Sequence, residues 1–121
     1  ARRKLVYGWT LASAGAGDDP MMAFVPTGQS GGTGGMKDVR MVRAGHDTIV
    51  RMPFSCAALV ARGDNVYGFS KDGYVMVAAA SRQKVNAYRM PFEIDEVFGV
   101  TDGGAAIVRA DSTVYIISLG N

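Results

Sequence analysis

The sequence predicts an all-β fold, and three observations support this prediction. Short segments rich in Val, Ile, Tyr and Phe recur at a spacing of roughly 8–12 residues, which is typical of β-sandwiches, barrels and propellers. The 16 glycines, accompanied by only four prolines, indicate many tight turns. No long window shows a helical period. The best helix candidate, 75–84, contains three alanines, but Val75 and Val77 favour a strand.

The expected strands are separated by Gly, Asp, Asn and Pro residues that favour turns. Segment 12–20, small and Gly-rich, is expected to be a loop. Pro53 is expected to end one strand and Pro91 to end an edge strand, because proline donates no hydrogen bond to a ladder. We expect strands at 5–9, 21–25, 39–43, 48–52, 57–61, 66–69, 74–80, 85–90, 96–100, 105–109 and 114–119.

Segment 27–37 contains five glycines and is expected to be a flexible loop. A phosphate-binding loop would need a Lys-Ser/Thr pair and a helix start after the glycines. Met36-Lys37-Asp38-Val39 supplies neither, so we expect no nucleotide and no other cofactor.

An apolar hairpin at 57–69 recurs 48 positions later at 105–117, with Ala, Ala, Val, Val and Tyr identical in both copies. A second repeat competes with this one at a spacing of 38 residues: Arg51-Met52-Pro53-Phe54 is identical to Arg89-Met90-Pro91-Phe92. The repeat at 38 residues covers only four residues, whereas the repeat at 48 residues extends over some 20. We therefore take 48 as the period, with about 12 extra residues in the first copy, because loop insertions cost little closure entropy.

A hairpin that repeats along a chain is typical of repeat architectures. We predict propeller-like blades of short antiparallel strands, incomplete at two to three blades. The whole chain, 1–121, is expected to form a single domain of about two repeats plus the tail of a third.

Several short motifs accompany the hairpins. Val6-Tyr7-Gly8-Trp9 is followed by Gly15-Ala16-Gly17-Asp18-Asp19, with Pro20 or Pro26 beyond. Ser55-Cys56 precedes the middle hairpin, which Val66-Tyr67-Gly68-Phe69 closes, and the chain ends with Val114-Tyr115 and then Gly120-Asn121. These motifs resemble the repeat of the regulator of chromosome condensation family.

The chain departs from that family's pattern at several positions. Phe69 and Ile117 stand where the family has Trp, and no Gly follows Cys56. The resemblance implies four-stranded blades, seven of them in a complete ring, and this chain is too short for seven. The family's founding member catalyses guanine-nucleotide exchange through loops of the complete ring, and no residue here can be matched to those loops. An exchange-factor fragment is therefore kept only as an alternative.

Few residues offer catalytic or metal-binding chemistry. His46 is the only histidine, Cys56 is the only cysteine, and the carboxylates of Asp18 and Asp19 point apart on an extended chain. We predict a protein that is not an enzyme, with no metal and no evident small-molecule substrate. A lone cysteine in an apolar segment favours a buried thiol and an intracellular setting, with an organelle possible. No run approaches the ~18 apolar residues of a membrane span.

The net charge of +2 is a weak bias. The aromatic residues at repeat positions are expected to pack between blades, and the alternative is a face that stacks on a ligand; they are Tyr7, Trp9, Tyr67 and Tyr115. Arginines interleaved with aromatic residues would suit an RNA backbone or an acidic protein surface. The candidate interaction surface comprises Arg2, Arg3, Lys4, Trp9, Arg40, Arg43 and Arg51.

These observations favour a non-catalytic protein-interaction or scaffold subunit that docks on a larger assembly. Its partners are expected to be other protein subunits or copies of itself, because an incomplete set of blades leaves apolar faces and strand edges uncovered. The alternative is an RNA- or nucleoprotein-associated peripheral subunit, for example of an organellar ribosome.

Overall fold

The computed structural model describes residues 8–27, 36–80 and 84–119. These residues form strands and turns and contain no helix. The strand expected at 74–80 is confirmed as β7 (Tyr74–Ala79), so the alternative of a helix beginning at residue 75 is wrong, in line with the preference of Val75 and Val77 for strands. The strands are β1 (Trp9–Ala14), β2 (Met22–Pro26), β3 (Met36–Arg43), β4 (His46–Cys56), β5 (Ala58–Arg62), β6 (Asn65–Phe69), β7 (Tyr74–Ala79), β8 (Val85–Arg89), β9 (Glu96–Val100), β10 (Ala105–Ala110) and β11 (Thr113–Ser118).

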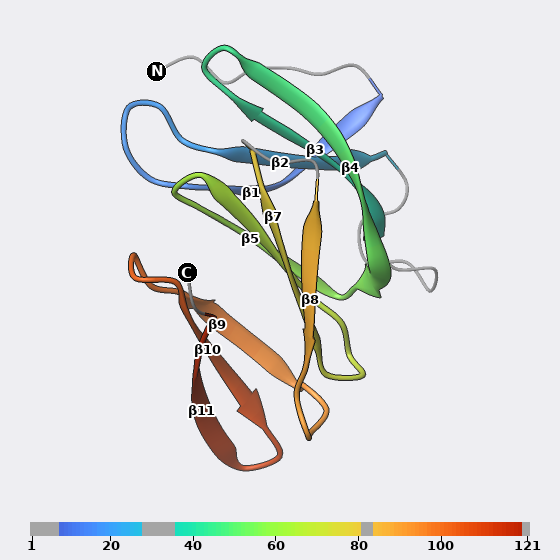
Figure 1. Ribbon diagram of the computed structural model, residues 1–121, viewed down its shortest axis with the longest axis vertical. Coiled ribbons are helices and arrows are strands. Elements are labelled where there is room, and N and C mark those ends of the chain that lie inside the picture. The colour runs from blue at the N-terminus through green and yellow to red at the C-terminus, as the bar shows by residue number, and fades with distance from the viewer. Residues whose placement is uncertain (1–7, 28–35, 81–83, 120–121) are drawn as a thin grey trace.

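The strands form three antiparallel sheets in which each strand pairs with the next along the chain. Sheet A has the order β1-β2-β3-β4, sheet B has the order β5-β6-β7-β8, and sheet C contains β9, β10 and β11. Figure 1 shows the three sheets following one another from the blue end of the chain to the red end. The prediction of an all-β fold with short antiparallel, blade-like sheets is confirmed.

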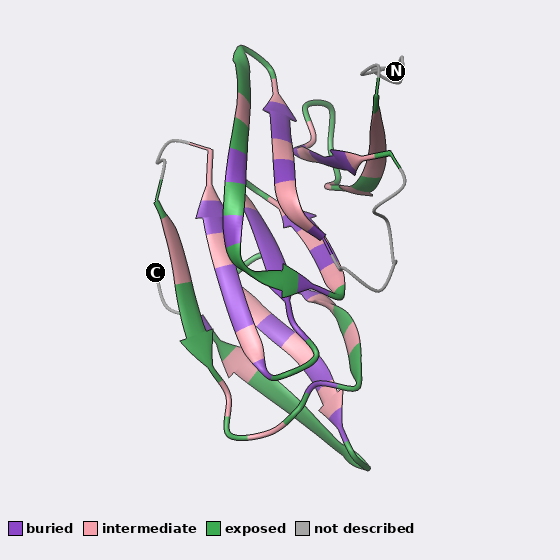
Figure 2. Ribbon diagram, turned by 90° about the vertical axis from the view of Figure 1, so that its right-hand side faces the viewer, coloured by how far each residue is buried: buried purple, intermediate pink, exposed green. Residues whose placement is uncertain are grey.

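Two apolar cores lie between consecutive sheets. Sheets A and B enclose a methionine-rich core, with Met41 and Met52 contributed by sheet A and Met76 by sheet B. Sheets B and C enclose a second core, which contains Phe69 of sheet B and Val108 of sheet C. Sheet B therefore contributes side chains from both of its faces, and Figure 2 shows that buried segments concentrate in the central strands.

The first strands of the three sheets lie side by side, β1 beside β5 and β5 beside β9. Polar contacts join them. The Ala61 amide donates to the Ser13 hydroxyl at 2.9 Å, which links β5 to β1. On the other side, Arg62 donates from Nε to the Val100 carbonyl at 2.8 Å and pairs with Asp102 at 3.0 Å. These contacts hold the sheets in this order because they join β5 to β1 on one side and to β9 and the turn after it on the other.

Several predicted boundaries need correction. Trp9 begins β1, which runs through part of the segment expected to be a loop; residues 1–7 lie outside the described part. The Gly-rich loop predicted at 27–37 is shorter at its end, because Met36 and Lys37 belong to β3; residues 28–35 also lie outside the described part. Pro53 does not end a strand, since it lies inside β4, an edge strand on which a missing amide donor is tolerated.

The predicted period of 48 residues is also wrong for the sheets. It matches β5–β6, the first two strands of sheet B, with β10–β11, the second and third strands of sheet C. The rejected spacing of 38 relates equivalent places: Arg51 lies on β4 and Arg89 on β8, each the fourth strand of its sheet. The 48-residue match reflects turn chemistry, because both hairpins turn through a left-handed residue, Gly63 with φ 62° and Asp111 with φ 58°.

Candidate interaction surfaces

The outer face of sheet C, which points away from sheet B, carries uncovered apolar side chains. The register places Ile107 opposite Ile116 and Arg109 opposite Val114, on the face opposite to Val108. Ile116 is 73% exposed and Val114 is 56% exposed. Phe98, at the bulge where β9 pairs with β10, is 54% exposed. Exposed apolar side chains gathered in this way are typical of interaction sites.

Strand β11 is also an open edge. In sheets A and B the third strand, β3 or β7, pairs with a neighbour on each side. Among the described residues, β11 pairs only with β10. Residues of β3 and β7 are mostly buried or half-buried, whereas five of the six residues of β11 are exposed. An edge of this kind presents unpaired backbone N–H and C=O groups to another chain.

The outer face of sheet A brings together three residues of the predicted interaction surface. Trp9, Arg40 and Arg51 share this face, and the Arg40 guanidinium carbon lies 5.7 Å from the centre of the Trp9 ring. Arg40 also makes a bidentate ion pair with Asp47, with contacts of 2.7 and 2.8 Å. The hydrogen bond with Asp47 raises the pKa of Arg40 above its usual range.

The other predicted residues lie elsewhere or outside the described part. Arg43 lies near the β5–β6 turn, where it donates to the Gly63 carbonyl at 2.8 Å and pairs with Asp64 at 3.4 Å. Arg51 pairs with Asp38 at 3.5 Å. Arg2, Arg3 and Lys4 fall outside the described residues. The structure therefore separates Arg43 from the other two arginines and places a carboxylate beside each of the three.

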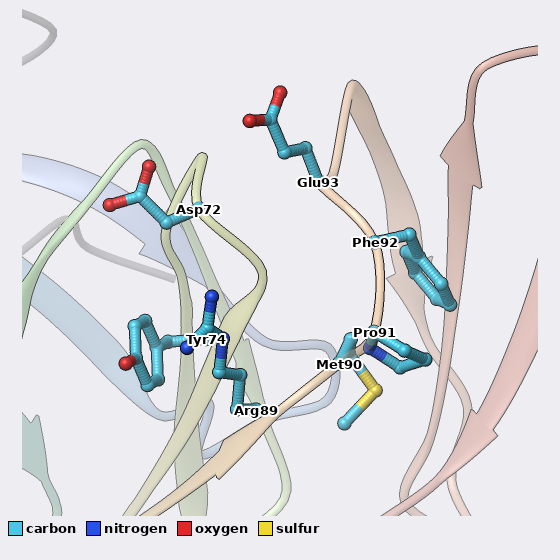
Figure 3. Close-up of a pocket in the computed structure, with 7 residues that line it drawn as sticks. All are labelled: Asp72, Tyr74, Arg89, Met90, Pro91, Phe92 and Glu93. Carbon is cyan, nitrogen blue, oxygen red and sulfur yellow. The ribbon is translucent and has the colours of Figure 1, made fainter.

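A pocket of about 610 Å³ lies between the β6–β7 turn and the β8–β9 connection. Figure 3 shows Asp72 and Tyr74 on one wall and Glu93 and Phe92 on the other. The Arg89 guanidinium lies 5.5 Å from the centre of the Tyr74 ring, and the two carboxylates stand at the rim. None of these residues belongs to a site predicted from the sequence, although the repeated Arg-Met-Pro-Phe motif ends in this wall.

The described residues offer little catalytic chemistry. They contain no group of three or more His, Cys, Asp or Glu side chains that could hold a metal ion. Cys56 is buried, as predicted, and its burial raises the pKa of the thiol from 9.0 to about 12, so the thiolate is scarce at neutral pH. His46 lines a smaller pocket of about 380 Å³ beside Arg43 and Asp47.

Comparison with protein-family models, curated proteins and solved structures found no match in any of the three. The described part of the chain contains no helix that is long and apolar enough to cross a membrane.

Proposed function

We propose that this chain is a non-catalytic interaction or scaffold subunit that docks on a larger protein assembly through sheet C. One observation carries the proposal: strand β11 of sheet C is apolar on both faces, but only one face is covered. The inner face packs on sheet B through Ala106 and Val108. The outer face leaves Val114 and Ile116 exposed.

Sheet B shows what an apolar strand that is covered on both faces looks like in this protein, for comparison with β11. Its strand β7 contains Val75 and Met76 next to one another, and both are buried because sheets A and C cover opposite faces. Strand β11 has the same kind of continuous apolar run, from Val114 to Ile117. Continuous apolar runs are typical of strands buried on both faces. A further protein layer over sheet C would give β11 the environment that β7 has.

The alternative of an RNA-associated subunit receives less support. RNA binding depends on cationic side chains that are available to phosphates. The described arginines of the predicted surface, Arg40, Arg43 and Arg51, lie beside carboxylates within 4 Å, which reduces the positive potential there. The exchange-factor alternative has no matched residue, and the family resemblance itself stays a prediction. We therefore favour a protein partner.

The test is a pull-down with three forms of the chain as bait: the unmodified protein, Ile116→Lys and Ile49→Lys. Ile49 is a matched control, because it is 57% exposed and lies on β4, an edge strand of a different sheet. We expect a protein to be retained in stoichiometric amount by the unmodified and Ile49→Lys forms and lost by Ile116→Lys. RNA in the eluate, with loss of the partner after nuclease digestion, would instead support the RNA alternative.

A further inference from the structure

We propose that the pocket between the β6–β7 turn and the β8–β9 connection binds a small zwitterionic amino acid. Arg89 holds the carboxylate of the ligand, and Asp72 and Glu93 hold its ammonium group. The sequence pointed to no small molecule because these three residues are brought together only by the fold. The pocket is lined by residues of sheet B and of the connection that follows it, so this site is separate from the docking surface proposed on sheet C.

Arg89 differs from the other described arginines because it has no carboxylate beside it. Each of the other five lies within 4 Å of an aspartate or glutamate: Arg40, Arg43, Arg51, Arg62 and Arg109. On β4, Arg51 lies opposite Asp38 and pairs with it at 3.5 Å. At the equivalent place on β8, Arg89 lies opposite Tyr74, which carries no negative charge. A carboxylate of a ligand can therefore take the place that Asp38 has in sheet A.

The Tyr74 ring holds the guanidinium of Arg89 at the pocket. The guanidinium carbon lies 5.5 Å from the centre of the ring, and the ring itself stacks on Phe54 at 3.8 Å. An arginine that rests on an aromatic ring keeps its N–H groups in a fixed plane. Two parallel N–H groups of a guanidinium match the two oxygens of a carboxylate. Arg89 is therefore well placed to donate two hydrogen bonds to a bound carboxylate.

The two walls of the pocket are joined by backbone hydrogen bonds, so the site exists before a ligand binds. The Met90 amide donates to the Gly73 carbonyl at 2.8 Å, and the Ile94 amide donates to the Lys71 carbonyl at 3.2 Å. A Cβ atom on Gly73 would overlap the Phe92 carbonyl, and the φ of Gly73 is 104°, a conformation that favours glycine. A site with walls already in place costs little ordering entropy when a ligand binds.

Asp72 and Glu93 provide a place for a cation at the opening of the pocket. They lie on opposite walls, and in the view of Figure 3 both carboxylates lie above the Arg89 guanidinium. Neither has a cationic side chain of the described residues within 4 Å. With two carboxylates against one guanidinium, the pocket repels a simple anion such as phosphate. A ligand that carries both charges satisfies all three groups.

The remaining lining and the size of the pocket suit an aliphatic amino acid. Met90 and Pro91 supply apolar surface beside Arg89. The volume of about 610 Å³ lies within the usual range of small-molecule sites. An aliphatic side chain can lie against Met90 and Pro91 while the two charged groups of the same ligand meet their partners.

The experiment compares L-leucine with two analogues that each lack one charge. Isocaproate keeps the side chain and the carboxylate, and isoamylamine keeps the side chain and the ammonium group. Each compound is titrated into the full chain, and the amide NMR signals of Asp72, Tyr74 and Glu93 are followed. We expect leucine to shift these signals saturably and each analogue to bind about tenfold more weakly or worse, because it leaves a charged group of the pocket unpaired.

The variants Arg89→Gln and Arg51→Gln give the matched comparison. Arg51 lies at the equivalent place on β4 but already pairs with Asp38. Arg89→Gln should weaken leucine binding by about tenfold or more, whereas Arg51→Gln should leave it within about twofold. Asp72→Asn changes an exposed turn residue and gives a second variant, which should weaken leucine and isoamylamine but not isocaproate.

Three results would overturn the proposal. The first is the absence of a saturable shift with leucine at concentrations up to about 10 mM. The second is isocaproate or isoamylamine binding as tightly as leucine, which would show that one charge is not recognised. The third is an equal loss of leucine binding in Arg89→Gln and Arg51→Gln, which would place the ligand elsewhere on the protein.

Discussion

The ring of Phe92 stacks on the ring of Tyr115, with 4.2 Å between the ring centroids and 17° between the ring planes. The ring of Phe54 stacks in the same way on Tyr74, at 3.8 Å and 11°. Each phenylalanine ends an Arg-Met-Pro-Phe motif: Phe54 lies on β4, and Phe92 lies just after β8. Each tyrosine lies on the third strand of the following sheet. The short motif therefore marks a contact that joins consecutive sheets.

This relationship predicts a measurable coupling between Phe92 and Tyr115. A double-mutant cycle with Phe92→Leu and Tyr115→Leu should give an interaction energy of about 0.5–1.5 kcal/mol in urea unfolding, because an aromatic pair contributes that much beyond its buried area. Tyr88 is the control, since it is an exposed residue of β8 without a ring partner among the described residues. A cycle between Phe92→Leu and Tyr88→Leu should give a coupling near zero. Equal coupling in the two cycles would refute the stacking contact.

The same motif shows why the strands could be predicted better than the arrangement of the sheets. Strand positions depend on local chemistry: β9, at Glu96–Val100, was predicted with its observed bounds. The arrangement depends on contacts between distant segments, such as Phe54 with Tyr74. The hairpin at 57–69 matches the one at 105–117 over many residues because any two hairpins with apolar strands and a two-residue turn have similar sequences, whatever their place in a sheet. The repeated Arg-Met-Pro-Phe motif covers only four residues, although its two copies begin at equivalent places, on the fourth strands of sheets A and B.

A close approach between Gly68 and Cys56 gives a second prediction. A Cβ atom added to Gly68 would lie 2.6 Å from the Cys56 sulfur, a distance at which one of the two groups must move. Gly68→Ala should therefore lower the free energy of unfolding by about 1–3 kcal/mol, which is the usual cost of overpacking a core. The measurement is urea unfolding followed by circular dichroism.

The control for this clash removes the sulfur. Cys56→Ala by itself creates a small cavity and lowers stability, but in that background Gly68→Ala should cost clearly less than it does in the unmodified protein. The same cost in both backgrounds would show that the Cys56 sulfur is not the group that resists the added methyl.

Tyr67 gives a third prediction, on the core between sheets B and C. Its side chain was expected to be buried between blades, and it is 5% exposed. Tyr67→Ala should cost about 3–5 kcal/mol, as large-to-small core substitutions do. Tyr67→Phe removes only the hydrogen bond that the Asn65 amide donates to the phenol oxygen at 3.2 Å, so it should cost about 0.5–1.5 kcal/mol. A melting temperature unchanged by Tyr67→Ala would contradict this burial.

The interaction surface could be predicted only in part. The sequence indicated that uncovered faces and edges would exist, because an incomplete set of blades leaves them. The sequence also predicted that basic residues would form the interaction surface. In the structure, however, Arg40 and Arg51 lie beside carboxylates on sheet A. Strand β11 carries three exposed apolar residues, Val114, Tyr115 and Ile116, in a run that resembles the buried strands of sheet B. Sequence pattern does not distinguish a strand already covered on both faces from one whose second face is open.

The central claim is that sheet C presents an association surface, and light scattering across a dilution series tests it most directly. Ile116 and Val114 are the exposed side chains concerned. We expect the unmodified protein to scatter with an average mass above 12.8 kDa at micromolar concentration and to approach 12.8 kDa on dilution. Ile116→Lys should stay closer to the monomer mass at every concentration, while Ile49→Lys should behave as the unmodified protein does. A folded protein that remains at 12.8 kDa throughout, in all three forms, would contradict the account.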